Sequence, residues 1–402
     1  MAEATATLPK DDAVDDDSGD WGPFGKPIFD DPSARALSRV GVVDVGSNSV
    51  RMVVFDGAAR SPAYFYNEKI MCGLGKGLAE TGKLNPEGKV RALAALRRFA
   101  LLAKGMDVDP FTVVATAATR EAEDGAEFQA EVLRETGLRL HVIDGAEEAR
   151  LSAQGVLLGW PEAKGVVCDI GGNSMELARI GNGLVGKRVS TPLGPFRLQQ
   201  IDGGAKKRKA HIDRVLEAAA KEIKSTGERV YLVGGSWRVI ARLDMERRNY
   251  PLTVLHEYRM TPEGLIDTLD WLASTDLAAL RGRTGTSAER MELVPLACEV
   301  LREIIRVLKP SEIDVSAYGI REGLLFEQMP ERLRARDPLI EAARMSELTQ
   351  ARIPGFGKKL FEFLMPLYKG TSVERLRLIK AACLLHDTTW RAHPDYRAEA
   401  CF

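Results

Sequence analysis

Two short polar turns carry the residue types that can hold a phosphate. Each turn follows an apolar run that ends in an aspartate, and each precedes a second apolar run, so we expect two hairpins. Turns rich in Gly, Ser and Asn can point several backbone N–H groups at one anion. A dinucleotide or P-loop turn would open a helix, which the β-branched residues after the first turn disfavour. The candidate phosphate-binding residues are Gly46, Ser47, Asn48 and Ser49 in the first turn and Gly171, Gly172, Asn173 and Ser174 in the second.

Three carboxylates lie beside these turns. Asp44 precedes the first turn, Asp169 precedes the second, and Glu176 follows the second. A carboxylate next to a bound phosphate is repulsive unless a cation lies between them, and Mg²⁺ prefers oxygen ligands. We therefore expect these three residues to hold Mg²⁺ (or Mn²⁺). One such turn alone would fit an ordinary hairpin equally well, but two matched copies indicate duplicated halves that close on one polyphosphate.

Hydrolysis of a phosphoanhydride also needs a base for the attacking water and positive charge on the phosphoryl group. Arg120 follows a predicted strand and can contact phosphate with both arms of its guanidinium, although a solvated surface arginine is an equal interpretation. Glu148 is a candidate base. It follows Glu147 at the start of a predicted helix, where acidic residues are also common because of the helix dipole.

Alternating strands and helices must position these residues. A periodic helix is expected from Pro86, and a buried strand at 111–115 leads to the turn that contains Arg120. The strand at 230–233 ends at a third candidate substrate-binding turn, followed by a helix. Strands alternating with helices, twice over, predict an α/β protein with mixed sheets, and the chain turns all helical from about residue 330. The third turn contains Gly234, Gly235 and Ser236.

The chain has 402 residues, a length that suggests two or three domains. Its residues are 45% hydrophobic and 28% charged, as in an ordinary globular protein. There is no apolar run long enough to cross a bilayer, no secretory signal, and no paired spacing among the five cysteines, so we expect a cytoplasmic protein. Residues 1–38 hold nine acidic and three basic residues and read as a disordered acidic extension. The whole chain has a net charge of −1, so residues 39–402 carry a net charge of about +5. A mildly basic body suits an anionic substrate, but it also fits an ordinary protein surface.

The segments DVGSNSVRMVV (from Asp44) and DIGGNSMEL (from Asp169) resemble the two phosphate loops of the exopolyphosphatase / guanosine pentaphosphate phosphohydrolase (Ppx/GppA) family, in the actin–Hsp70–sugar kinase superfamily. Further motifs match in the right order, so the resemblance runs from about residue 39 to the end. These motifs are ATAATREAEDG (115–125), DGAEEARL (144–151), VGGSWR (233–238) and YGIREGLL (318–325).

The resemblance implies two duplicated actin-like (ribonuclease H-like) α/β domains facing a cleft, at 39–160 and 161–329. A helical HD-like segment at 330–402 would follow, and it stops part-way through that domain at Phe402. In the family the second Glu of the E-E-A-R run is the catalytic base, which is Glu148 here. The resemblance also implies a homodimer acting on inorganic polyphosphate or guanosine pentaphosphate (pppGpp), with no nucleic-acid or membrane partner.

Some features depart from the family pattern. Asn173 replaces the third glycine of the second loop, where a left-handed backbone would be tolerated. Trp237, after the third turn, would disfavour a nucleoside and so favour polyphosphate. The pair His386-Asp387 resembles an HD metal pair, but no earlier His lies in that segment, so we interpret it as structural. If a long substrate is held toward the helical segment, the candidate cations there are Arg332, Arg334, Arg336, Lys358 and Lys359.

Four functions remain open from the sequence. The first is an exopolyphosphatase, a Mg²⁺-dependent enzyme that removes terminal phosphate with a Glu-activated water. The second is the same reaction on pppGpp. The third is a chaperone-like or sugar-kinase-like ATP-binding protein, which would lack the E-E-A-R and T-A-A-T-R runs at these places. The fourth is a non-catalytic polyphosphate or alarmone sensor, which would be expected to lose Glu148.

Overall fold

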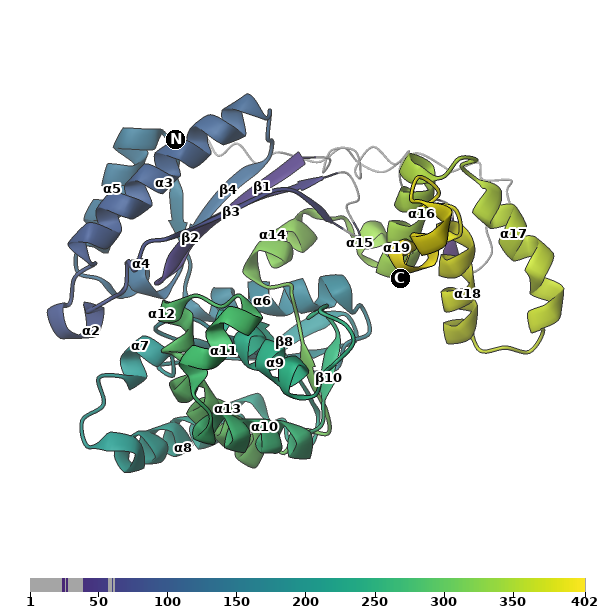
Figure 1. Cartoon of the computed structure of the whole chain (residues 1–402). Coiled ribbons are helices and arrows are strands. Elements are labelled where there is room, and N and C mark those ends of the chain that lie inside the picture. The colour runs from purple at the N-terminus through teal and green to yellow at the C-terminus, as the bar shows by residue number, and fades with distance from the viewer. Residues whose placement is uncertain (1–23, 26, 28–38, 57–59, 61, 402) are drawn as a thin grey trace.

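The computed structural model describes residues 24, 25, 27, 39–56, 60 and 62–401. Two α/β bodies face one another, and a group of helices lies to one side of both (Figure 1). The acidic extension lies almost wholly outside the described residues. Within them, no helix is both long enough and apolar enough to cross a membrane.

The first body is built on a five-stranded sheet with the order β3-β2-β1-β4-β5. The pairs β1/β2 and β2/β3 are antiparallel, whereas β1/β4 and β4/β5 are parallel. Helices α3 (Pro86–Gly105) and α5 (Gly125–Thr136) cover one face of the sheet (Figure 1). The strands are β1 Arg39–Val45, β2 Ser49–Asp56, β3 Ala63–Met71, β4 Phe111–Ala115 and β5 Leu140–Val142, and the short helices are α2 Leu78–Thr81 and α4 Ala117–Glu121.

The second body repeats this plan, with the order β10-β11-β9-β6-β7-β8. The β6/β7 hairpin corresponds to β1/β2, β8 to β3, and the parallel strands β9 and β11 to β4 and β5. The two predicted hairpins and the duplicated α/β halves are therefore confirmed. The strands are β6 Gly165–Ile170, β7 Met175–Gly181, β8 Leu184–Thr191, β9 Arg229–Gly234, β10 Tyr258–Met260 and β11 Ile313–Val315.

Helices pack on the second sheet around a large apolar core. The sequence predicts one helix at 288–307, but the structure has two, because the chain breaks before Pro295, which lacks an amide hydrogen and favours the first turn of a helix. The helices of this body are α7 Pro195–Leu198, α8 Gly204–Ile223, α9 Gly235–Arg247, α10 Pro262–Ser274, α11 Leu277–Thr284, α12 Ala288–Met291 and α13 Val294–Leu308.

Helices α6 (Gly145–Gly159) and α14 (Ile320–Gln328) cross between the two sheets. Their backbones approach closely because glycines lie at the crossing. A Cβ at Gly323 would overlap the carbonyl oxygen of Leu151, and one at Gly155 would overlap that of Gly319. This close crossing fixes α6, which carries Glu148, against α14 at the boundary between the two bodies.

The C-terminal region is helical, as predicted, and forms its own small apolar cluster. Phe24 packs on this cluster, and Arg344 donates to the carbonyl oxygens of Phe24 and Gly25. From the sequence alone, the segment around Phe24 could either dock on the rest of the chain or make no contact, with no contact favoured; the structure places Phe24 and Gly25 against the C-terminal helices. The helices are α15 Glu331–Arg334, α16 Pro338–Gln350, α17 Phe356–Leu364, η3 Met365–Tyr368, α18 Val373–Leu385, η4 Pro394–Tyr396 and α19 Arg397–Cys401.

Candidate active site

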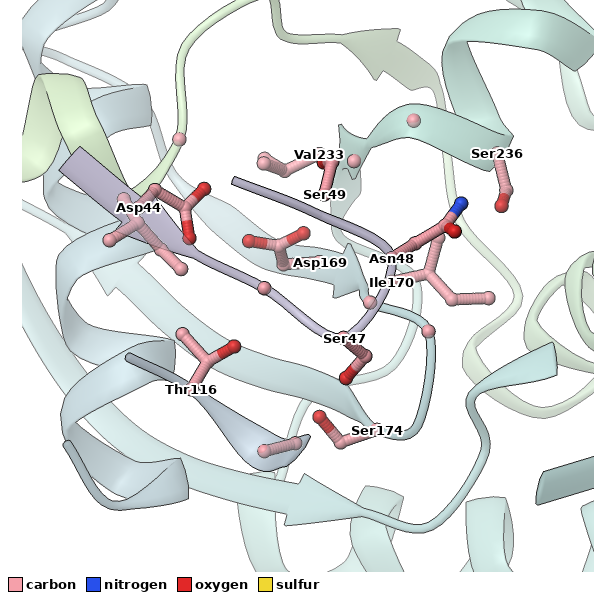
Figure 2. A pocket seen from close by; sticks show the side chains of 18 of the residues that line it. Asp44, Ser47, Asn48, Ser49, Thr116, Asp169, Ile170, Ser174, Val233 and Ser236 are labelled. Atoms are coloured by element: carbon pink, nitrogen blue, oxygen red, sulfur yellow. The ribbon is translucent and has the colours of Figure 1, made fainter. Parts of the chain in front are cut away.

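A polar cavity of about 190 Å³ lies where the β1/β2 and β6/β7 turns approach one another. Figure 2 shows Ser47 and Asn48 of the first turn and Ser174 of the second bordering this space, with Asp44 and Asp169 directed into it. The third turn also lines the cavity, through Gly234, Gly235 and Ser236. The structure therefore brings all three predicted turns to one place.

The two hairpin turns have the same internal hydrogen bond. Gly46 N donates to Ser49 O (3.0 Å), and Gly171 N donates to Ser174 O (2.9 Å). Both glycines line the cavity, but their amides already donate inside the turns and are not free to donate to a phosphate. The amides of Ser47, Asn48 and Gly172 have no acceptor among the described residues, and they remain candidates for binding an anion.

The glycine-rich segment 73–77 supports the first turn. Gly73 N donates to Asn48 O (2.9 Å), and Gly75 N donates to Ser47 O (2.8 Å). A Cβ at Gly75 would lie 2.9 Å from the Cβ of Ser47 and 3.2 Å from Asn173 Oδ1, so only glycine fits between the two turns. The segment therefore holds the first turn in place at the edge of the cavity.

Asn173 differs from its expected position. It is buried, it does not line the cavity, and its φ is not positive, so the left-handed backbone considered for it is not used. Its Oδ1 lacks a hydrogen-bond partner among the described residues and faces Gly75. The side chain thus packs between the two turns and does not crowd a bound phosphate.

We predict that Asn173→Gly leaves the KM for substrate unchanged, because the Asn173 side chain points away from the cavity. The variant should instead unfold at a lower temperature, since glycine gains backbone freedom in the unfolded chain and leaves a small void. Steady-state kinetics with a thermal melt check both points. A clearly lower KM would show that Asn173 obstructs the substrate after all.

Two of the three predicted metal ligands face the cavity. Burial raises the pKa of Asp44, and the Arg321 and Arg51 guanidinium groups oppose that shift. Burial also raises the pKa of Asp169, which accepts a hydrogen bond from Ser152 Oγ on α6. The Asp44 carboxylate adds to the raised pKa of Asp169, so a cation placed between the two would be favourable.

Glu176 does not line the cavity, which corrects its assignment as a direct ligand. It is buried on β7 and accepts a hydrogen bond from Ser190 Oγ (2.8 Å). Burial, with the nearby Glu148 and Asp169 carboxylates, raises its pKa well above the ordinary value. Glu176 can therefore act only through the residues that do line the site.

Glu148 lies in the first turn of α6, is 5% exposed and lines the cavity. Burial raises its pKa to about 8, with the Asp169 and Asp44 carboxylates adding to the shift and Arg120 opposing it. Arg120 Nη1 donates to Glu148 Oε2 (3.1 Å) and to Ile143 O (2.8 Å). Arg120 does not line the cavity, so the structure places it behind Glu148 and not on a phosphate.

Glu147, by contrast, points toward the surface and pairs with Arg150. Its backbone N–H donates to the side chain of Asp144, which caps α6. The sequence interpretation of Glu147 as an acid at the helix start therefore agrees with its position, whereas Glu148 is turned inward beside the carboxylates.

Five cations line the cavity, and the sequence did not select any of them as site residues. Two lie on the first sheet and three on helices of the second body and of α14. Three of the five lie inside motifs that carry the family resemblance, and this position in the motifs could have identified them from the sequence. Their convergence gives the site the positive charge that a polyphosphate needs. The five are Arg51, Lys69, Arg238, Arg290 and Arg321.

Trp237 is fully buried in the core of the second body and does not line the cavity. The expectation that its ring disfavours a nucleoside is therefore wrong. Gly234, with φ of 113°, lets the chain pass close to Asp169, because a Cβ there would lie 3.1 Å from Asp169 Oδ1. The turn directs the N-terminus of α9 toward the cavity, where its dipole favours an anion.

His256 and the His386-Asp387 pair do not line the cavity. His256 packs between Trp160 and Tyr318, and its Nδ1 accepts from Ala317 N (3.2 Å). Asp387 accepts from the guanidinium of Arg352 (2.5 Å), and His386 Nδ1 lies 2.8 Å from Cys383 O.

Two duplicated sheets that face one another across paired phosphate-binding turns define an actin-like α/β protein. Within that class, the chain belongs to the Ppx/GppA phosphatase family, whose model matches residues 53–332. It is 28% identical over 311 residues to exopolyphosphatase 1 of Mycobacterium leprae, covering 72% of this chain and 89% of that protein.

Solved structures agree with this fold. An exopolyphosphatase-like protein is similar with a TM-score of 0.65 and 25% identity, covering 74% of this chain and 99% of that one. An exopolyphosphatase from Cytophaga hutchinsonii has a TM-score of 0.65 and 22% identity, covering 75% and 99%. A Ppx/GppA family member from Aquifex aeolicus has a TM-score of 0.60, 24% identity and coverages of 72% and 97%.

Proposed function

We propose that this protein is an exopolyphosphatase that hydrolyses the terminal phosphoanhydride of inorganic polyphosphate. The observation that carries the proposal is one cavity in which paired phosphate-binding turns, five cations and a buried glutamate with a raised pKa converge. Similarity to mycobacterial proteins named exopolyphosphatase supports the choice of substrate.

Phosphoryl transfer to water needs groups that hold the phosphate and a base for the water, and different residues of the cavity fill these roles. The free amides of the two turns, with Asn48 and Ser174, hold the terminal phosphate. Glu148 accepts a proton from the attacking water, and its raised pKa makes it a stronger base than an exposed glutamate. Arg120 holds the Glu148 carboxylate in place through its own bond to Ile143 O.

A divalent cation fits the donor set at Asp44 and Asp169, two carboxylates with raised pKa values that line the same cavity, where Asp44 adds to the shift of Asp169. The described residues contain no group of three or more His, Cys, Asp or Glu side chains that could hold a metal by themselves. Mg²⁺ commonly takes one or two carboxylates together with water and substrate phosphates, so two protein ligands suffice. When bound, Mg²⁺ would neutralise charge on the phosphates.

Hydrolysis of pppGpp remains the second candidate. The one sequence feature that argued against a nucleoside was Trp237, and its burial in the core removes that argument. Phosphate release from long-chain polyphosphate, pppGpp and ATP, each with and without Mg²⁺, tests the proposal. Release from polyphosphate that needs Mg²⁺ supports it, whereas release from pppGpp alone would assign the second function. Binding without release would indicate a sensor.

The pH dependence of turnover follows from Glu148. A general base acts only when deprotonated, so kcat should rise about tenfold per pH unit below its pKa and level off above about pH 8. A nearby bound cation lowers the pKa of a carboxylate, so the rising limb should move to lower pH as Mg²⁺ is raised. A flat profile between about pH 6 and 9, at every Mg²⁺ concentration, would remove Glu148 from this role.

We also propose a homodimer and a cytoplasmic location, on the family resemblance and the sequence composition. Light scattering coupled to size-exclusion chromatography measures the first, and fractionation of the source cells measures the second.

A further inference from the structure

A row of charged side chains crosses the first sheet from the cavity to its edge. The strand register places Asp44 of β1 opposite Arg51 of β2, and Arg51 opposite Lys69 of β3, which is the edge strand. Residues paired in this way lie on the same face of a sheet. Arg51 and Lys69 therefore continue outward from the carboxylate beside the terminal-phosphate site.

A second row of cations faces the first from α9. Arg238 lines the cavity, and Arg242 follows four residues later on the same side of the helix. The guanidinium of Arg290 lies against the first turn of α9, because a Cβ at Gly235 would be 3.5 Å from its Nη2. Arg242 is exposed and close enough to Arg290 to lower its pKa, so the row continues from the cavity to the surface.

In the part of the chain that the structure describes, the cations of these two rows lack carboxylate partners, whereas most other arginines of the second body form ion pairs. Among the described residues, none of Arg51, Lys69, Arg238, Arg242 and Arg290 forms an ion pair with a carboxylate. Arg238 Nε is buried and has no acceptor within the described part of the chain. Unpaired buried charge is unfavourable, so this arrangement indicates an anionic ligand with several charges.

The pKa values of two of these cations are lowered, first by burial and then by the neighbouring cations. Burial lowers the pKa of Lys69 to about 7, and the Arg290, Arg51 and Arg238 cations lower it further, against Asp44. Burial and the neighbouring Arg321 and Arg238 lower the pKa of Arg51 to about 10. Both shifts would be relieved by phosphates lying among the cations.

A neighbouring pocket shares Asn48, Phe196 and Leu293 with the cavity. Its other charged lining residues are two carboxylates, Glu289 and Glu292, and two cations, Lys76 and Arg91. The charges in this pocket balance, whereas cations without carboxylate partners among the described residues line the side between β3 and α9.

Three of the five C-terminal cations expected to hold the distal chain are engaged with other groups, and none of the five lines the cavity. Arg334 donates to Glu327 O and Met329 O, Arg336 pairs with Glu341, and Lys358 pairs with Glu362. The structure therefore gives no reason to route the substrate along these helices.

We propose that the distal phosphates of the substrate lie between β3 and α9, along Arg51, Lys69, Arg238 and Arg290, and leave the protein at Arg242. This route rests on the proposed polyphosphate hydrolysis. It replaces the C-terminal route expected from the sequence.

Arg242→Gln tests the route with two substrates of different length. Tripolyphosphate has only two phosphates beyond the terminal one, so it should reach fewer cations of the row than long-chain polyphosphate does. We expect the ratio of the long-chain KM to the tripolyphosphate KM to rise by about two- to tenfold, as for loss of one charged contact. The salt slope of long-chain binding, measured by calorimetry, should fall by about 0.7, by analogy with single-stranded nucleic acid.

The control is the double variant Lys358→Gln/Lys359→Gln, in which both measures should match the parent. If that variant lowers long-chain affinity and Arg242→Gln does not, the route is wrong and the C-terminal helices hold the chain. If Arg242→Gln has the parent's affinity and salt slope, the route is also overturned, whatever the control does. Absence of hydrolysis in the parent with intact long-chain binding would refute the proposed function and leave the route standing.

Discussion

Glu148→Gln is expected to lower kcat by about 10²–10⁴-fold while the substrate still binds, because the amide cannot accept the proton of the attacking water. The substitution keeps the size of the side chain, and Arg120 can still donate to the remaining oxygen. The loss should therefore appear in kcat and not in KM. Single-turnover phosphate release measures the chemical step, and calorimetry with polyphosphate measures binding.

Glu147→Gln is the matched control, one residue away on the same helix. Its side chain pairs with Arg150 outside the cavity, so the variant should stay close to the parent in kcat. Near-full activity of Glu148→Gln would exclude Glu148 as the base. Equal losses in both variants would indicate a defect of α6 itself.

Asp169→Asn is expected to raise the Mg²⁺ concentration for half-maximal rate by about 10–100-fold, because it removes a charged oxygen from a site with few protein ligands. Asp169 lines the cavity, and its other oxygen is held by Ser152. Removing Mg²⁺ from the parent with a chelator should abolish turnover and let it return on adding the ion. Rate titrations against Mg²⁺ provide the measurement.

Glu176→Gln is the comparison for this experiment. The residue is equally buried but lies outside the cavity, so its effect on the Mg²⁺ titration should be smaller than that of Asp169→Asn. If the Asp169→Asn curve overlays the parent curve, the cation is held elsewhere. A larger shift for Glu176→Gln would restore Glu176 as a ligand.

The duplicated fold was predictable because its signals are local. One continuous stretch of sequence predicts each hairpin: an apolar run, an aspartate, a small polar turn and a second apolar run. The identical hydrogen bonds from Gly46 to Ser49 and from Gly171 to Ser174 follow from that shared pattern. Glu148 could be selected only through the family resemblance, since its inward orientation depends on the crossing of α6 with α14.

Other features depend on contacts between distant segments, which the sequence does not display. Trp237 directly follows the third turn, yet the start of α9 directs it into the core while Arg238 faces the cavity. Arg120 was assigned to phosphate, but the structure places it on Glu148, which is 28 residues away. The cation rows arise from strand register and from the approach of two bodies, so no single motif contains them.

Hydrolysis in water enriched in ¹⁸O tests the central claim most directly. If the protein removes terminal phosphates with a water activated by Glu148, each orthophosphate released from polyphosphate should carry one oxygen from the solvent. Release should need Mg²⁺ and should be lost in Glu148→Gln. Release of phosphate without solvent oxygen, or transfer of the phosphoryl group to another acceptor, would contradict the account.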